Sequence, residues 1–207
     1  MFRQQARFVL ALLCLVSAWA LKDPATGISF PGAHKDTSLI GVGVRKKGPL
    51  KLYSVAMYAQ AALKEKLGGI SKSDKKAALA ALQSAAGEGP CNFLLEMNFK
   101  VGAEKIASGL ANSVIPRHSG SNADVESLKN MILGGVSANC KGGAAVKGTQ
   151  LEFMCSPETG VDVSVNGKEQ GNVPSPALAK AFCDVYLDDK AVSPALVNSC
   201  IETNCAP

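Results

Sequence analysis

Residues 41–58, with the sequence GVGVRKKGPLKLYSVAMY, constrain the fold of this chain most strongly because they predict a β-hairpin. The first strand is expected in the apolar run at residues 39–44. Residues 46–49 carry a turn signal, and residues 50–58 form the second strand. Neither face of the second strand is mainly charged, so we expect other layers to cover both sides of the hairpin.

Two side chains of this hairpin can bind an anion together, namely Arg45 and Tyr53. A four-residue loop would pair Arg45 with Leu50 and send Tyr53 to the opposite face. A five-residue loop would pair Arg45 with Lys51 and place Tyr53 diagonally on the same face, about 7–8 Å away. In that second register, the guanidinium and the phenol hydroxyl can hold one carboxylate through charge-assisted hydrogen bonds.

A structural role for Arg45 is the alternative. Most arginines are exposed or paired with an acid of their own chain. Here Glu96 and Glu152 are the candidate partners, or Arg45 lies in water at the end of its strand.

Five segments of the chain share an order with a known family. GISFP precedes the hairpin, and AEKIASGLANSVIPR, GTQLEFMCSPETGVDVSVNGK and PALAKAFCDVYLDDKAVSPALVNSC follow it. The hairpin itself reads glycine-x-glycine-x-arginine, a turn, then lysine-x-tyrosine. Together these segments resemble the chalcone isomerase family. The resemblance implies an α+β domain over residues 21–207: an antiparallel β-sheet with helices packed on one face, an open-faced β-sandwich.

The same resemblance separates two functions inside the family. Members that isomerise chalcones carry a substrate-contacting tyrosine and asparagine where Gly102 and Gly109 stand here. Their hairpin threonine corresponds to Tyr53, and a late hydroxyl residue falls near Ala179. Arg45 alone is retained. Oriented donors contribute strongly to this kind of catalysis, so we expect a poor isomerase.

An arginine with a tyrosine at the threonine position resembles the fatty-acid-binding members, in which this pair holds the carboxylate. The resemblance implies that Arg45 and Tyr53 bind a fatty acid or another apolar carboxylate, without efficient catalysis and without a cofactor. Each buried methylene of the ligand would contribute about 0.8 kcal/mol. Two alternatives remain: an intramolecular lyase that converts chalcones to flavanones using Arg45, and a secreted interaction protein whose pocket has collapsed.

Periodicity and capping residues predict the remaining elements. Strands are expected at residues 28–30, 92–100, 149–155 and 161–165, and helices at 74–85, 103–114 and 124–133. In the strand at 92–100, alternate residues form one apolar face that we assign to the core: Phe93, Leu95, Met97 and Phe99.

Short motifs predict where some elements begin and end. Gly134-Gly135 is expected to end the helix at 124–133, and Asn166-Gly167 is typical of a two-residue hairpin turn. Ser175-Pro176 and Ser193-Pro194 each place a serine cap before a proline in the first helical position, which predicts two helices at the end of the chain.

Residues 1–20 predict a secretory signal peptide. Arg3 and Arg7 precede an apolar run at residues 8–16, and Ala18-Trp19-Ala20 is a small-x-small cleavage site. The apolar run is too short to span a bilayer, and no second long apolar segment follows, so we expect no stable membrane span. The expected location is the secretory pathway or the extracellular space; a plastid reached by a signal-peptide-led route is the alternative.

The charge balance argues against a nucleic-acid partner. Removing Arg3 and Arg7 from the 22 basic residues leaves 20, against 17 acidic residues, and most of the basic residues are scattered. A chain of this length can bury one sizeable core, so we expect a single domain and a monomer. His34 and His118 lie far from each other and no CxxC motif occurs, so no metal site is expected.

Six cysteines remain after the predicted removal of Cys14, and an even number agrees with an exported disulfide-bonded protein. Many pairings are possible. Because Cys183 and Cys200 fall on consecutive predicted helices, their pairing is our first expectation, and Cys140 with Cys155 is the second. Buried free thiols are the alternative.

Signal-peptide removal has a simple spectroscopic consequence. Trp19 is the only tryptophan among the 207 residues, so cleavage after Ala20 should leave a protein without tryptophan fluorescence. Material recovered from a secreting cell is expected to emit from tyrosine alone. The same chain made without processing serves as the control, and tryptophan emission from the secreted material would contradict the predicted cleavage site.

Overall fold

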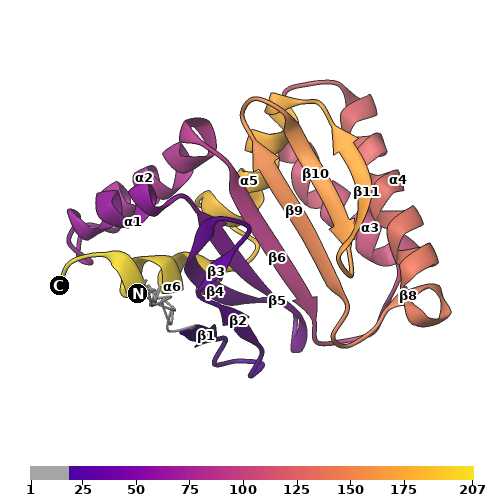
Figure 1. The fold of residues 1–207 in the computed structure, drawn as a ribbon, viewed down its shortest axis with the longest axis horizontal. Helices are drawn as coiled ribbons and strands as arrows, with labels where there is room; N and C mark the ends of the chain where they lie inside the picture. The colour runs from indigo at the N-terminus through magenta and orange to yellow at the C-terminus, as the bar shows by residue number, and fades with distance from the viewer. Residues whose placement is uncertain (1–18) are drawn as a thin grey trace, which may run out of the picture.

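The computed structural model describes residues 19–207, in which seven strands form one curled antiparallel sheet (Figure 1). Their spatial order is β11-β10-β9-β6-β5-β4-β3. The strands are β3 (Ala33–His34), β4 (Thr37–Lys47), β5 (Leu50–Ala59), β6 (Cys91–Met97), β9 (Gln150–Ser156), β10 (Gly160–Val165) and β11 (Lys168–Val173). Two short pairs lie outside this sheet: β1 (Ala20–Lys22) with β2 (Ser29–Pro31), and β7 (Val101–Gly102) with β8 (Ala144–Ala145).

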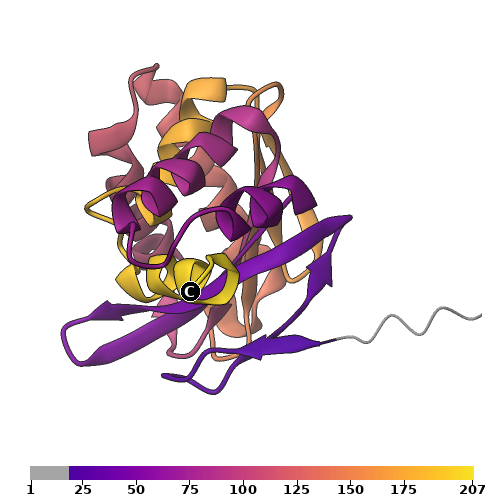
Figure 2. The same ribbon diagram turned by 90° about the vertical axis from the view of Figure 1, so that its left-hand side faces the viewer.

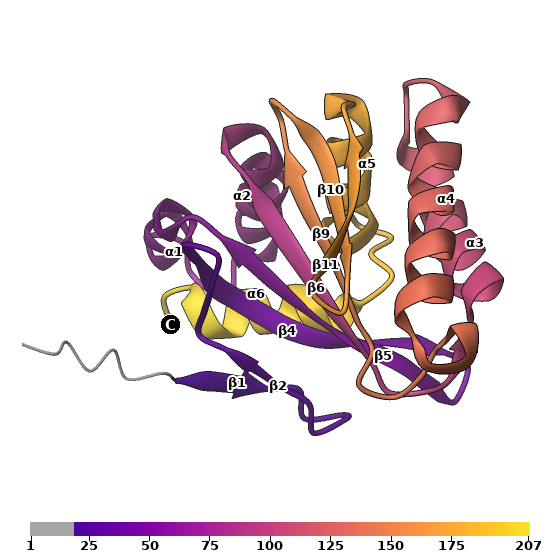
Figure 3. The same cartoon turned by 45° about the vertical axis from the view of Figure 1, so that its right-hand side comes forward.

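The α-helices of the described residues lie on one face of the main sheet (Figure 3). They are α1 (Ala61–Gly68), α2 (Lys75–Glu88), α3 (Ala103–Val114), α4 (Asn122–Asn139), α5 (Pro176–Leu187) and α6 (Pro194–Asn204). Two short 3₁₀ turns follow α3 and α4: η1 (Ile115–Arg117) and η2 (Lys141–Gly143). The predicted α+β fold, with helices packed on one face of an antiparallel sheet, is confirmed.

The larger hydrophobic core fills the space between the helices and this face of the sheet. Alternate residues of the central strands contribute to it, among them Val55, Phe93 and Phe153. From α5, Phe182 and Tyr186 pack on Phe93 with ring centroids 6.0 and 5.0 Å away. Aromatic contacts of this kind add to the gain from burial, so α5 is fixed firmly against the middle of the sheet.

The opposite face of the hairpin is covered by the N-terminal strands. Phe30 of β2 packs with Leu39, Val42 and Tyr58 in a second, smaller apolar cluster. Figure 2 shows β4 and β5 between α6 on one side and the β1–β2 pair on the other. The expectation that both faces of the hairpin are covered is therefore confirmed.

The register of the hairpin differs from both expected registers. Lys47 pairs with Leu50, so the loop is the two residues Gly48-Pro49, and Gly48 supplies the positive φ of +57° that a tight turn requires. The ladder then shifts by one residue, and Arg45 pairs directly with Tyr53. The extra residue is Leu52, which forms a β-bulge. Because directly paired residues share a face, the bulge brings the two predicted anion-binding residues together.

The glycines of the hairpin allow α6 to lie directly on β4. A Cβ atom at Gly41 would lie 2.6 Å from the sulfur of Cys200, and one at Gly43 would lie 2.2 Å from the backbone nitrogen of Leu196. Both glycines lie on the same face of β4 as Arg45, and this is the face that α6 covers. Any side chain at these positions would push α6 away from the strand.

Side chains of α6 also satisfy the outer edge of β4. Asn204 Nδ2 donates to the carbonyl of Ile40 at 2.7 Å, and Ser199 Oγ accepts from the amide of Val42 at 3.1 Å. An unpaired strand edge would otherwise expose these groups or leave them unsatisfied. The helix therefore replaces a neighbouring strand along this part of the sheet.

Ser193 departs from its expected role as the cap of the last helix. Its hydroxyl donates to the carbonyl of Val44 at 3.0 Å and makes no capping hydrogen bond. Ser175 does cap α5, by accepting from the amide of Leu178 at 3.3 Å. Both predicted helices begin at proline, as expected.

Two element boundaries were predicted wrongly. Gly134-Gly135 does not end α4, which continues to Asn139. A Cβ at Gly135 would lie 2.7 Å from Val165, so this glycine provides close contact with the sheet rather than a helix end. The strand predicted at 92–100 ends at Met97, and Phe99 is 48% exposed rather than in the core.

Neither expected disulfide is present, because all six cysteines of the described residues are free thiols. Cys155 pairs across the strands with Cys91, and Cys183 of α5 interacts with both of them. Burial raises the pKa of the Cys200 thiol, which lies under β4 instead of beside Cys183. The positions of α5 and α6 on the sheet therefore decide the thiol neighbours.

The predicted signal peptide lies outside the described residues except for its last two. The carbonyl of Trp19 accepts from the amide of Gly32 at 2.7 Å, and Lys64 Nζ lies 4.8 Å from the Trp19 ring centroid. Within residues 19–207, no helix is both long enough and apolar enough to cross a bilayer.

The contact between α6 and β4 predicts a large effect of a small substitution. Gly43→Ala should destabilise the fold by about 3 kcal/mol, because the new methyl group overlaps the backbone at Leu196. Gly134→Ala is the control: it adds a methyl group to an exposed helical glycine with no neighbour within 4 Å and should stabilise by about 0.5–1 kcal/mol. Denaturant unfolding of both variants measures the difference, and equal midpoints would contradict this account.

Candidate ligand-binding cleft

A cleft of about 770 Å³ lies between the free end of the β4–β5 hairpin and α3. Figure 3 shows this end of the hairpin near the lower end of α3. Its apolar lining comes from Leu50, Leu52, Phe99, Val101, Ile106 and Leu110. Its basic lining comes from Arg45, Lys47, Lys100 and Lys105, and no acidic side chain contributes to it. The cleft is therefore suited to an apolar molecule that carries a negative charge.

Arg45 occupies this cleft as a half-buried cation. One terminal nitrogen, Nη1, donates to the carbonyl of Val192 at 2.8 Å. No carboxylate in residues 19–207 lies within ion-pair distance of its guanidinium. A guanidinium has five N–H donors, so several remain for a ligand.

The two acids considered as partners of Arg45 bind other groups. Glu152 lies on the opposite face of the sheet, where its Oε1 accepts from Asn92 at 2.6 Å and from His34 at 2.8 Å. Glu96 accepts from Gln150 at 3.1 Å. The internal ion pair proposed as the structural alternative for Arg45 is therefore wrong.

Tyr53 forms the inner wall of the cleft beside Arg45. Its side chain is almost fully buried, and its hydroxyl lies 3.1 Å from the hydroxyl of Tyr186 on α5. Burial raises the pKa of both phenols, while the nearby charge of Arg45 opposes that effect. Both hydroxyls therefore stay protonated at neutral pH. One proton is used within the pair, so the other can be donated to a third group.

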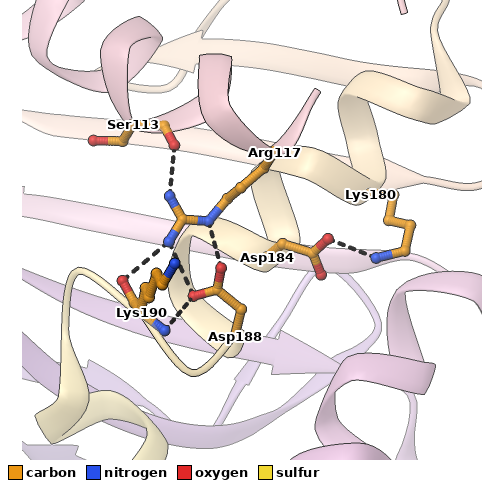
Figure 4. A network of polar contacts seen from close by, with 6 residues as sticks. All are labelled: Ser113, Arg117, Lys180, Asp184, Asp188 and Lys190. Atoms are coloured by element: carbon orange, nitrogen blue, oxygen red, sulfur yellow. Dashed lines mark hydrogen bonds and ion pairs between the residues drawn. The ribbon is translucent and has the colours of Figure 1, made fainter. Parts of the chain in front are cut away.

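The loop that holds Arg45 is itself tied to the cleft wall (Figure 4). Arg117, in η1 directly after α3, binds Asp188 with two hydrogen bonds of 2.7 and 2.9 Å. It also donates to the carbonyls of Ser113 and Lys190 at 2.8 and 3.0 Å. The same loop presents the carbonyl of Val192 to Arg45, so this network fixes the end of α3 relative to the guanidinium.

The positions that bear substrate-contacting side chains in chalcone isomerases behave differently from one another. Gly102 and Gly109 line the cleft, and a Cβ at either would have no neighbour within 4 Å. Their lack of side chains leaves that volume open. Ala179 is buried in the core instead, and it is not part of the cleft lining.

Several residues of the cleft were missed from sequence. Lys100 and Lys105 read as scattered charges, and only the pairing of β7 with β8 and the position of α3 bring them beside the hairpin. Nothing in the sequence indicated that Tyr186 lies beside Tyr53, because the pattern predicted only an aromatic residue in a helix. Within the described residues, no group of His, Cys, Asp or Glu side chains could hold a metal ion.

The paired phenols predict a non-additive effect on stability. Tyr186→Phe and Tyr53→Phe should each destabilise the protein by about 1–3 kcal/mol, since each leaves one buried hydroxyl without its partner. The double variant should lose less than the sum, because neither hydroxyl is then left unpaired. Urea unfolding of the four proteins measures the coupling, and strict additivity would contradict the pairing.

Comparison with known proteins identifies the family. Residues 28–199 match the family model described as chalcone isomerase-like. A crystal structure of a fatty-acid binding protein from Arabidopsis thaliana is similar in fold, with a TM-score of 0.72 and 19% sequence identity over 90% of this chain and 97% of that chain. No curated protein sequence is significantly similar. On its match over most of its length, the chain belongs to the chalcone isomerase-like family.

Proposed function

We propose that this protein binds a fatty acid or a similar apolar carboxylate in the cleft between the hairpin and α3. The observation that carries the proposal is the half-buried guanidinium of Arg45, which faces an apolar cleft and has no carboxylate partner in residues 19–207. An unpaired cation in such a place is costly unless a ligand or water compensates it. A bound carboxylate would supply the missing partner.

The composition of the cleft supports the same ligand class. Its volume of about 770 Å³ lies within the range of typical small-molecule sites. Six apolar side chains can contact a hydrocarbon tail, and each methylene removed from water contributes about 0.8 kcal/mol. Four basic side chains and no acidic one favour an anion over a neutral molecule. The similar Arabidopsis protein is described as a fatty-acid binding protein, which agrees with this proposal.

Arg45 and Tyr53 are proposed to contact the carboxylate itself. Their direct cross-strand pairing places both side chains on one face, and the carbonyl of Val192 accepts one hydrogen bond from the guanidinium. The phenol beside it remains protonated and can donate a third hydrogen bond. This arrangement fixes which end of the ligand enters first, while the apolar lining provides most of the affinity.

The proposed role is binding without efficient catalysis. Gly102 and Gly109 supply no side-chain donor at the two cleft positions that the resemblance aligns with the isomerases' substrate-contacting residues, so the oriented donors that would stabilise a developing enolate there are missing. The open volume also favours a binding protein over the alternative of a collapsed pocket. We further propose that the chain is exported after cleavage at Ala20 and acts as a monomer.

Ligand titration by calorimetry tests the role of Arg45. Arg45→Ala should weaken the binding of a fatty acid by about 10- to 150-fold, the loss expected for hydrogen bonds to a charged group. The matching fatty-acid methyl ester carries no charge and should bind both proteins similarly. Equal loss for acid and ester would contradict a carboxylate contact.

A second pair of variants tests the place of binding. Gly109→Phe should block the cleft without disturbing the fold, because the new side chain enters open space. Gly134→Phe, on an exposed helical glycine that does not line the cleft, is the matched control. Retained binding in Gly109→Phe would place the ligand elsewhere.

Two measurements test the alternatives. Turnover of a chalcone to a flavanone by the purified protein, lost in Arg45→Ala, would support the intramolecular lyase. Native mass spectrometry after gentle purification should show a co-purifying lipid in the binding protein, whereas a collapsed pocket would carry none.

A further inference from the structure

We propose that the open end of the cleft docks on an anionic lipid bilayer, from which the ligand enters; the ligand part of this statement depends on the proposed function. We call this surface the cleft mouth. It comprises two exposed apolar side chains and five exposed lysines: Leu50, Phe99, Lys46, Lys47, Lys51, Lys100 and Lys105.

The apolar part of the cleft mouth is exposed without a covering element. Leu50 is 44% exposed and Phe99 is 48% exposed, and both line the cleft. Among the large hydrophobic residues of the described chain, Trp19 and Ile115 are the others exposed to this degree. Two of these four side chains therefore lie at one opening of the cleft, where their exposure to water is unfavourable.

Hydrogen bonds join the segment that carries Phe99 to the strand that carries Leu50. Leu52, the bulge residue, accepts through its carbonyl from the amides of Asn98 and Phe99 at 2.9 and 3.1 Å. Asn98 Nδ2 also donates to the carbonyl of Lys51 at 3.1 Å. The bend that carries Phe99 is thus fixed to the hairpin strand that carries Leu50, and both residues line the same cleft.

Lys47, Lys100 and Lys105 line the cleft beside this apolar centre. Lys46 and Lys51 pair with each other on the opposite face of the hairpin tip, where Lys51 Nζ donates to the carbonyl of Ala25 at 2.6 Å. The hairpin segment contributes Lys46, Lys47 and Lys51, and residues 37–64 contain no acidic residue. The acid nearest in sequence to Lys105 is Glu104, whose carboxylate lies 3.4 Å from Lys129 of α4 and accepts from Ser108. The net charge of the cleft mouth is therefore strongly positive.

This combination fits a bilayer surface better than a protein interface. Apolar side chains on short exposed loops can enter the boundary between headgroups and acyl chains, while lysines bind anionic headgroups. Lysine-rich surfaces are uncommon in the centre of protein interfaces. An acyl ligand could then pass from the bilayer into the cleft between Leu50 and Phe99 without crossing water.

Vesicle co-sedimentation of the whole protein tests the proposal. The protein should bind vesicles of equal phosphatidylcholine and phosphatidylserine, bind pure phosphatidylcholine far less, and dissociate at high salt. Lys46→Gln/Lys51→Gln should weaken binding by about 25-fold, or about fivefold for each lysine. Lys75→Gln/Lys76→Gln, which neutralises two exposed lysines on α2, is the matched control and should bind like the original protein.

A second comparison separates insertion from simple charge attraction. Leu50→Ser should reduce vesicle binding, whereas Ile115→Ser should not, because Ile115, although 54% exposed against 44% for Leu50, lies in η1 after the C-terminal end of α3 and does not line the cleft. Equal behaviour of these two variants, or of the two lysine pairs, would overturn the proposal.

Failure of docking and failure of ligand binding give different results. Lys46 and Lys51 do not line the cleft, so fatty-acid titration without vesicles reports the cleft alone. Fatty-acid binding without any attachment to the mixed vesicles would overturn the docking proposal and leave the ligand proposal standing. If the protein attaches to vesicles through the cleft mouth but binds no fatty acid, the docking proposal stands. The proposal that a ligand enters the cleft from the bilayer is then wrong.

Discussion

The contact between α6 and β4 is the interaction on which the rest of the structure depends. Gly41 and Gly43 allow the helix backbone to approach the strand, and polar side chains of the helix satisfy the strand's free edge. The helix begins at Pro194, directly after the loop that contains Val192. Arg45, two residues beyond Gly43 on the same face, therefore meets that loop rather than the helix.

This arrangement explains how the fold keeps a cation without an acidic partner. The Val192 carbonyl satisfies one donor of Arg45, and the loop is held in place by the two-pronged contact of Arg117 with Asp188. A neutral carbonyl does not cancel the positive charge, so the site keeps its attraction for an anion. A neighbouring carboxylate would have removed that attraction, and Glu152, one of the two candidates from sequence, is occupied on the opposite face of the sheet.

The same cleft can serve different purposes depending on which side chains enter it. At Gly102 and Gly109, which the resemblance aligns with the isomerases' substrate-contacting residues, this chain has no side chain, and the cleft is open there. Tyr53 is turned toward Tyr186 and the charge of Arg45, which suits recognition of a carboxylate. The lysines and apolar side chains at the open end extend the site toward the surface from which such a ligand would arrive.

The sequence by itself determined the elements with strong local patterns: the hairpin, the strands with alternating apolar residues and the two proline-initiated helices. It also determined the family and the candidate pair Arg45 and Tyr53. Only the tertiary structure decided the register of the hairpin. The carbonyl of Leu52, the bulge residue, accepts from the amides of Asn98 and Phe99, which lie in the connection between β6 and β7. The thiol neighbours and the Arg117–Asp188 contact were likewise invisible, because their partners are far apart in sequence. Local periodicity sets which way a side chain points, whereas packing of distant segments sets what it meets.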